Sequence, residues 1–407
     1  MTPTMAPPTT PPTTPPTPIR FADSEDALHE EATRIAGCSD FGDPGYLEGL
    51  RILLDGYDQE ARFNDHGHTM ARQMILGILV GRLRSEQRLR AIPERLEHPI
   101  ERPIVICGLT RTGSTALHYL MGQDPDLQAL EYWLGCSPQP RPPRNEWKDH
   151  PDFRSADAQI RAMYDADPSL KAVHFMMPDL PEECRQLMVQ QFTDDGFEVN
   201  NHMPTYSSWY QQADMLPTYR RHRDLLGLIG SGDPTRPWLL KYPVHMRYLD
   251  TVLEVYPDAC VVQTHRDPLS VFPSYLSLIT GFRALNERDI DPGEIARRQV
   301  DLWASGAEHA IEVRRKKNPK QFYDLHFADF MTDPIEAVKK IHAYFGRELS
   351  EAGETRLRAW HTNNPQHKHG RHEYSRADED VGISRGEILE RFSLYMEHFG
   401  MQPEERP

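Results

Sequence analysis

The sequence predicts an α/β fold: a P-loop-like, three-layer α/β/α domain with a central parallel sheet and an N-terminal helical cap. Three observations predict it. From Ile104 onward, short apolar runs alternate with helical patterns, which is typical of a parallel sheet covered by helices. The first apolar run leads directly into a glycine-containing loop and then into a helix. The region before it, residues 21–100, shows helical patterns.

The 407-residue chain begins with a segment, residues 1–20, that is dominated by threonine and proline. Because proline removes backbone donors and the segment has no apolar surface to bury, we expect a disordered tail, partly in the polyproline conformation. We interpret it as a solubilising tail; the alternative is a recognition motif for a proline-binding domain.

Residues 21–100 are predicted to form the helical cap. Ser24 and the two acidic residues after it are typical of a helix N-terminus. Leucines recur at helical spacing over 47–54, and apolar residues do so again over 74–79. We expect this cap to pack against the α/β domain, residues 101–400.

The α/β domain is predicted from its alternating patterns. Strands are expected at 103–107, 237–241, 259–264 and 321–325. Helices are expected at 114–122, 155–166, 182–194, 217–229, 246–255, 269–280, 291–316, 334–345 and 350–360. The proline-rich stretch 135–151 is predicted to be a long loop. A parallel sheet of this kind binds its ligands at the carboxyl ends of its strands.

Composition excludes several classes of protein. The net charge of −15 argues against nonspecific nucleic-acid binding, although it leaves room for a local basic pocket. Five scattered cysteines without CxxC spacing fit a reduced, cytoplasmic protein without a zinc site. The longest strongly apolar stretch, around 74–80, is too short to span a membrane, and the N-terminus does not read as a secretory signal. The oligomeric state stays open, a homodimer included.

The loop after the first predicted strand is the most informative motif. It runs from Gly108 to Gly113, with four residues between the glycines, and a helix follows. Backbone N–H groups in such a loop, with the positive end of the helix, can cradle a phosphate or sulfonate. The triphosphate version of this loop requires lysine after the second glycine. Ser114 stands there, and Arg111 inside the loop offers a cation instead.

A second anion-binding motif follows the strand predicted at 259–264. Arg266 comes at its carboxyl end, and Ser274 follows eight residues later in the next helix. An arginine placed there can hold a phosphate through two parallel hydrogen bonds. Alone the pair means little, since an arginine paired with Asp267 and a serine bonding its own helix would look the same. Together with the glycine loop, we interpret it as the second half of one site.

The two motifs together resemble the sulfotransferases, which carry a sulfonate from 3′-phosphoadenosine 5′-phosphosulfate (PAPS) to an acceptor. The resemblance implies that the 5′-phosphosulfate is held by Arg111, Thr112, Gly113, Ser114 and Thr115. It implies that Arg266 and Ser274 hold the 3′-phosphate.

The resemblance extends to the bacterial-type branch of the family and covers most of 25–400. Further similar segments lie at 174–184, 240–245, 264–278 and 369–375. Two positions depart from the family pattern. Arg111 stands where many cytosolic members have lysine, and Tyr242 stands where this branch often has serine, which puts one sulfonate contact in doubt.

The resemblance also implies that the segment around 369–375 folds over the nucleotide, with Arg371 contacting a phosphate. The same segment contains His367, His369 and His372. We do not interpret these as a metal site, because their spacing suits no single helix face and Gly370 breaks a helix.

Sulfonate transfer, like phosphoryl transfer, requires an acceptor in line and neutralisation of charge on the bridging oxygen. Arg111 and Lys241 are the candidate cations, since Lys241 ends a predicted strand and would point into the same crevice. The alternative for Lys241 is a strand-end lysine that reaches solvent. No metal is expected, because arginine and lysine can supply the charge.

Three residues are candidates for the general base that takes the acceptor's proton. Glu131 ranks first because it lies 20 residues after Arg111, and the resemblance to tyrosylprotein-type and some bacterial sulfotransferases places the base at this spacing. His174 ranks second because an imidazole titrates near neutral pH. Glu183 ranks third, since acids in the first turn of a helix often only complement its dipole.

The acceptor is expected to be a small molecule, and a hydrophobic alcohol or phenol is favoured. Methionine and aromatic side chains form adaptable apolar walls, although ordinary core packing would explain them equally well. The candidates are Phe175, Met176, Met177, Tyr206, Trp209 and Tyr210. Two alternatives stay open: a kinase or NTPase with a variant P-loop, and a non-catalytic nucleotide-binding protein.

Overall fold

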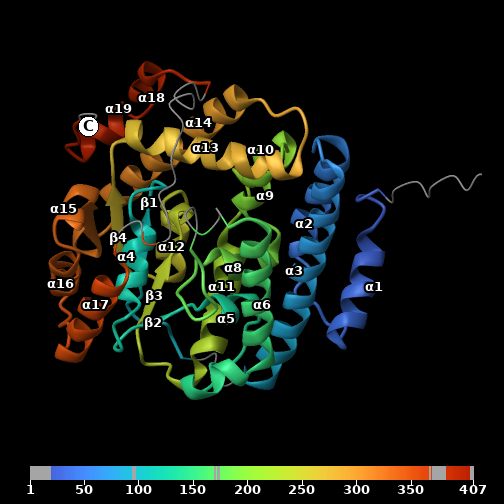
Figure 1. Ribbon diagram of the computed structural model, residues 1–407, viewed down its shortest axis with the longest axis horizontal. Coiled ribbons are helices and arrows are strands. Elements are labelled where there is room, and N and C mark those ends of the chain that lie inside the picture. The colour runs from blue at the N-terminus through green and yellow to red at the C-terminus, as the bar shows by residue number, and fades with distance from the viewer. Residues whose placement is uncertain are drawn as a thin grey trace, which may run out of the picture.

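The computed structural model describes residues 20–93, 98–168, 171, 175–365, 368 and 382–403. Its centre is a five-stranded parallel sheet with the order β2-β3-β1-β4-β5 (Figure 1). The strands are β1 (Ile104–Gly108), β2 (Gln128–Ala129), β3 (Trp238–Lys241), β4 (Cys260–His265) and β5 (Phe322–His326). The predicted fold class is confirmed, and so are the four predicted strands, to within one residue at each end. The short strand β2 was not predicted, because two residues carry no periodic signal.

The central strands are apolar because they lie between two helical layers. Every residue of β1, β3 and β4 is buried, as expected for a parallel sheet covered on both faces. Successive side chains of β1 alternate between the faces, with Val105 and Cys107 in one apolar core and Ile104 and Ile106 in the other. The strand register brings the carboxyl ends of β1, β3 and β4 to one edge of the sheet.

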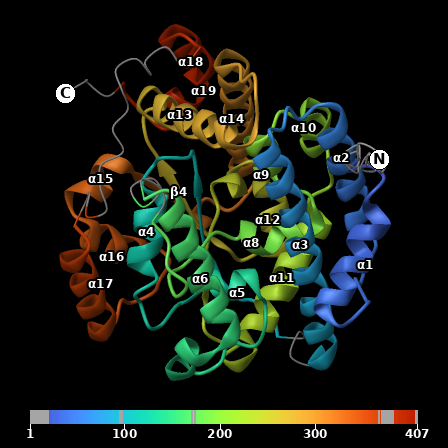
Figure 2. The ribbon, with the colours of Figure 1, turned by 45° about the vertical axis from the view of Figure 1, so that its right-hand side comes forward.

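Helices from different parts of the chain cover the two faces. One apolar core contains residues of α4 (Ser114–Met121), α15 (Phe327–Thr332), α16 (Pro334–Tyr344) and α17 (Glu351–Asn363). The other contains residues of α11 (Leu216–Ile229), α12 (Leu249–Val255), α13 (Pro268–Asn286) and α14 (Pro292–Arg315). Figure 2 shows α15, α16 and α17 at the left and the N-terminal helices at the right.

The N-terminal region is helical, with α1 (Glu25–Ala36), α2 (Tyr46–Gln59) and α3 (Asp65–Ala91). Asn64 begins α3, since its side chain accepts a hydrogen bond from the N–H of Gly67 at 2.8 Å. The helix α3 contacts α11 and α13, and α2 contacts α10 (Pro204–Tyr210). Buried residues of α1, α2 and α3 therefore belong to the same apolar core as those of α11 and α13.

The remaining α-helices are α5 (Tyr132–Cys136), α6 (Pro151–Ala166), α8 (Arg185–Met188), α9 (Asp195–Asn200), α18 (Arg385–Arg391) and α19 (Ser393–His398). Two predictions were wrong in detail. The segment 182–194 is not one helix, because α8 passes into a 3₁₀ turn and Phe192 then adopts a left-handed φ of 54°. The predicted loop 135–151 contains a 3₁₀ helix, Arg144–Asp149. The other predicted helices are present. Among the described residues, no helix is long and apolar enough to cross a membrane.

Candidate active site

The glycine loop is shaped by backbone conformations that few residues adopt. Gly108 has a φ of 136°, and a Cβ there would lie 2.4 Å from the carbonyl oxygen of Thr264 on β4. Arg111 and Gly113 are left-handed, with φ of 60° and 81°. The helix α4 begins immediately afterwards at Ser114, so its unpaired N–H groups lie at the loop. This is the arrangement that a strand–loop–helix anion cradle needs.

The side chain of Thr112 stabilises the loop through hydrogen bonds inside the protein and does not line the cavity that the loop borders. Thr112 is buried, and its hydroxyl donates to the carbonyl oxygen of Leu109 at 2.8 Å. The hydroxyl oxygens of Thr112 and Thr264 are 2.6 Å apart. Only the backbone of Thr112 is therefore left to contact an anion.

The structure brings the two predicted anion-binding motifs together. Arg111 Nε donates to Ser274 Oγ at 3.0 Å, which joins the loop to α13. Arg266 donates to the carbonyl oxygen of Arg111 at 3.3 Å. The guanidinium of Arg266 also lies 4.1 Å from the centre of the Phe327 ring. Two cations and one hydroxyl from distant parts of the chain thus lie at the start of α4.

Lys241 lies at the end of β3, with its side chain 3% exposed. Its ammonium group donates to Thr115 Oγ1 at 3.1 Å and forms an ion pair with Glu183. Backbone contacts place Glu183 there: the N–H of Glu182 donates to Leu130, and that of Cys184 donates to Lys241. The segment before α8 therefore crosses the carboxyl ends of β2 and β3 and carries Glu183 to the site.

These groups line a cavity of about 600 Å³. The polar part of its lining contains Thr110, Arg111, Gly113, Ser114, Thr115, Glu183, Lys241, Arg266, Ser270 and Ser274. An apolar part contains Val199, Tyr275, Leu278, Phe282 and Trp303. Sequence reasoning missed this apolar wall. The spacing of Tyr275, Leu278 and Phe282 after Ser274 was a signal for it, because residues three and four apart share one helix face.

The three candidate bases are not equally placed. Glu131 does not line this cavity. Its carboxylate accepts hydrogen bonds from Arg141 at 2.9 and 3.2 Å, and both side chains are nearly buried beside a separate pocket. His174 lies outside the described residues, and so does Arg371. Glu183 has a side chain that is 25% exposed, and it lines the cavity beside Lys241.

The six predicted acceptor-pocket residues do not line the cavity. Tyr206 and Tyr210 belong to the core, and Tyr206 donates its hydroxyl to the carbonyl oxygen of Phe192 at 2.7 Å. Met177 lies instead in the pocket beside Glu131. The core-packing alternative describes the two tyrosines correctly.

A buried charged cluster forms a further part of the cavity lining. Arg185 Nε donates to Asp194 Oδ1 at 2.7 Å, and the Tyr242 hydroxyl donates to Asp195. Arg185, Asp195 and Tyr242 line the cavity. Burial raises the pKa of Asp194 to about 6, with a contribution from the neighbouring charge of Asp195, and burial raises the pKa of Asp195 as well. Tyr242, the departure from the family pattern, therefore contacts this carboxylate cluster.

Three comparisons place the chain among known proteins. A sequence profile described as the sulfotransferase family matches residues 103–351. The crystal structure of sulfotransferase STF1 from Mycobacterium tuberculosis H37Rv is similar, with 36% identity, a TM-score of 0.84 and coverage of 92% of this chain and 100% of that chain. STF9 from Mycobacterium avium shares the fold, with 24% identity, a TM-score of 0.86 and coverage of 94% and 98%.

Among sequence relatives, the omega-hydroxy-beta-dihydromenaquinone-9 sulfotransferase Stf3 of Mycobacterium bovis is 25% identical over 300 residues. The match covers 71% of this chain and 74% of that protein. In the part of the chain that the structure describes, no group of three or more His, Cys, Asp or Glu residues is arranged to hold a metal ion.

Proposed function

This chain belongs to the sulfotransferase family, and from that premise we propose that it transfers a sulfonate from PAPS to the hydroxyl of a small hydrophobic alcohol or phenol. One observation carries the proposal: the glycine loop and the Arg266–Ser274 motif converge on one cavity, where Arg111 donates to Ser274. Membership of the sulfotransferase family favours sulfonate transfer over the phosphoryl transfer of the kinase alternative.

The residues around the loop fit the donor. The start of α4 and the Arg111 guanidinium would hold the 5′-phosphosulfate, since backbone N–H groups and a cation meet there. Arg266 and Ser274 would hold the 3′-phosphate. Lys241, buried beside Thr115, would neutralise the charge that develops on the bridging oxygen.

Glu183 is the base in this proposal, in place of Glu131. Glu183 lines the cavity beside Lys241, whereas the carboxylate of Glu131 is held by Arg141 beside a different pocket. The acceptor hydroxyl would give its proton to the Glu183 carboxylate as its oxygen bonds to sulfur. The bond between sulfur and the bridging oxygen breaks in line, and the leaving phosphate keeps that electron pair.

The cavity lining supports a hydrophobic acceptor. Apolar and aromatic side chains, Val199, Leu278, Phe282 and Trp303 among them, line it next to the charged groups. The relative Stf3 is named for a hydroxylated menaquinone. An apolar molecule that carries a hydroxyl group would fit this cavity, because its hydroxyl could meet the charged groups while the rest contacts the apolar side chains.

Calorimetric titration with 3′-phosphoadenosine 5′-phosphate (PAP) tests the proposal, with ATP and Mg²⁺ as the rival ligand. Micromolar binding of PAP without binding of ATP is expected, and PAPS with a phenol such as 2-naphthol should then give a sulfated product. Preference for ATP would overturn the proposal, because it would mean that the loop holds a triphosphate without the usual lysine.

A further inference from the structure

An apolar stripe on α13 runs from the cavity lining to an exposed leucine. Tyr275, Leu278, Phe282 and Leu285 are spaced by three, four and three residues, so they lie on one face of the helix. The first three line the cavity. Leu285 is 52% exposed. At about 1.5 Å per residue, the stripe is about 15 Å long.

The aromatic residues of this wall offer apolar surface, because their polar atoms already have partners inside the protein. The Trp303 indole N–H donates to the Tyr275 hydroxyl at 3.1 Å. That hydroxyl donates in turn to Gln299 Oε1 at 2.9 Å. An acceptor lying here would therefore meet ring surfaces, and neither donor is left for it.

The two helices that form this side of the cavity are fixed to each other. Arg283 on α13 donates to the carbonyl oxygens of Val199 and Glu198 on α9, at 3.0 and 2.6 Å. Val199 itself lines the cavity. The buried side chain of Arg283 therefore holds α13 against α9.

The exposed end of the stripe is also held in place. The side chain of Asn64 donates to the carbonyl oxygen of Leu285 at 3.0 Å, and the Asn64 N–H donates to that of Asn286 at 2.9 Å. A single exposed leucine is common on protein surfaces. Leu285 is informative because it continues a helix face whose other members line the acceptor cavity.

We propose that the acceptor is an elongated amphiphile: an alcohol whose terminal hydroxyl lies at Lys241 and Glu183 and whose aliphatic chain leaves the cavity along α13, past Leu285. This rests on the proposed sulfonate transfer. It narrows the acceptor class from any hydrophobic alcohol or phenol to long-chain, lipid-like alcohols, since compact phenols would leave the outer part of the stripe uncovered.

The test uses the full chain saturated with PAP and titrated calorimetrically with 1-hexanol, 1-decanol and 1-tetradecanol, the last supplied as its cyclodextrin complex and long enough, when extended, to pass the whole stripe. Affinity should rise about fourfold for each added methylene group that contacts the wall, as for transfer of a methylene from water to an apolar surface. Leu285→Gln should weaken 1-tetradecanol binding by about fivefold and leave 1-hexanol binding unchanged. Leu394→Gln is the matched control, since Leu394 is 41% exposed on α19 and does not line the cavity.

The outcomes separate the two proposals. Absence of PAP binding would overturn the sulfotransferase proposal itself. If PAP binds but the alcohols do not, or if their affinity does not depend on chain length, the elongated acceptor is wrong and the donor site stands. An equal effect of Leu285→Gln on all three alcohols would also contradict the inferred path.

Discussion

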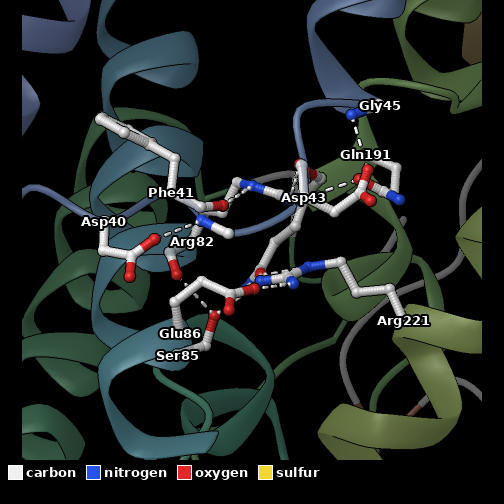
Figure 3. Close-up of polar contacts among 11 residues, drawn as sticks. Asp40, Phe41, Asp43, Gly45, Arg82, Ser85, Glu86, Gln191 and Arg221 are labelled. Carbon is white, nitrogen blue, oxygen red and sulfur yellow. Dashed lines mark hydrogen bonds and ion pairs between the residues drawn. The ribbon is translucent and has the colours of Figure 1, made fainter. Parts of the chain in front are cut away.

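Two buried clusters of arginines and carboxylates in this protein look alike in composition and differ in what they face. The first joins the N-terminal helices to the core (Figure 3). Arg82, 1% exposed on α3, donates to the carbonyl oxygens of Phe41 and Asp43, each at 2.7 Å. It also donates to Gln190 O and Gln191 Oε1, at 3.0 and 2.8 Å. All three nitrogens of its guanidinium group therefore have partners in the protein.

Arg221 of α11 completes the first cluster. It forms an ion pair with Glu86 and donates to Ser85 Oγ at 3.0 Å (Figure 3). It also donates to Gln190 Oε1 at 2.7 Å. Burial lowers the pKa of Arg82 to about 9, with a contribution from the nearby positive charge of Arg221. Arg82 is still protonated at neutral pH.

The second cluster lies against the active-site cavity. Arg185 and Asp195 belong to it, and both line the cavity. In the first cluster, the arginines donate mainly to backbone, amide and hydroxyl oxygens of the segments that the cluster connects. In the second cluster, charged side chains line a cavity that a ligand can enter. Composition alone does not separate a structural charged cluster from a functional one; the surroundings of each polar atom do.

The sharpest test of the cavity side is Glu183→Gln. We expect kcat to fall by about 10²- to 10⁴-fold, because the proposed general base is lost, while PAP still binds in a calorimetric titration. Glu131→Gln is the matched control, and it should retain most of its activity because Glu131 faces Arg141. The reverse result, an active Glu183→Gln and an inactive Glu131→Gln, would return the base to Glu131.

In the first cluster, Arg82→Met should lower the stability of the folded protein. It leaves four oxygens without their donor, two in buried and two in partly buried hydrogen bonds, and we expect the free energy of unfolding to fall by about 3–5 kcal/mol in urea denaturation. Arg84→Met on the same helix controls for the substitution and should change it by no more than about 0.5 kcal/mol. A fully stable Arg82→Met protein would show that the cluster is dispensable.

Arg266→Ala removes an arginine that lines the cavity, and its effects can be compared with those of Arg82→Met. A charge-assisted contact to phosphate is worth about 1.5–3 kcal/mol, so PAP affinity should fall at least about tenfold in calorimetry. Urea denaturation should show a smaller loss of stability than for Arg82→Met. Arg288→Ala, on the exposed surface, is the control. Unchanged PAP affinity would remove Arg266 from the donor site.

The same contrast explains how much the sequence could predict. The strands were predictable because β1 and β4 are continuous apolar runs, and the two anion-binding motifs could be recognised because each has a local spacing. That Glu183 and not Glu131 lines the cavity could not be predicted, since it depends on a backbone contact between Cys184 and Lys241. The partners of Arg82 are equally remote, with Gln190 lying 108 residues away in the chain. Contacts between residues so far apart in the chain leave no periodic pattern in the sequence, so they could not be predicted from it.

The smallest expected effect concerns the pH dependence of the cavity cluster. Because burial raises the pKa of Asp194 to about 6 in the folded protein, the folded state binds the proton more tightly than the unfolded chain does. The stability that this proton contributes is fully present below about pH 4 and is lost as the pH rises towards 6 and beyond. Asp194→Asn should therefore reduce the fall in unfolding free energy over this range.

The readout is the slope of stability against pH, not its absolute value, because Asp194→Asn also changes the hydrogen bond that Asp194 accepts from Arg185 and shifts stability by an amount unrelated to the proton. Urea denaturation at several pH values between 4 and 7 would measure it, with the exposed Asp23→Asn as control. If the slope does not change, the proton is held elsewhere in the cluster, with Asp195 the next carboxylate to replace. If the slope flattens, Asp194 is the group that titrates. The cavity cluster then contains a carboxylate that changes its charge with pH, whereas the Arg82 cluster is built around a guanidinium whose three nitrogens all have partners.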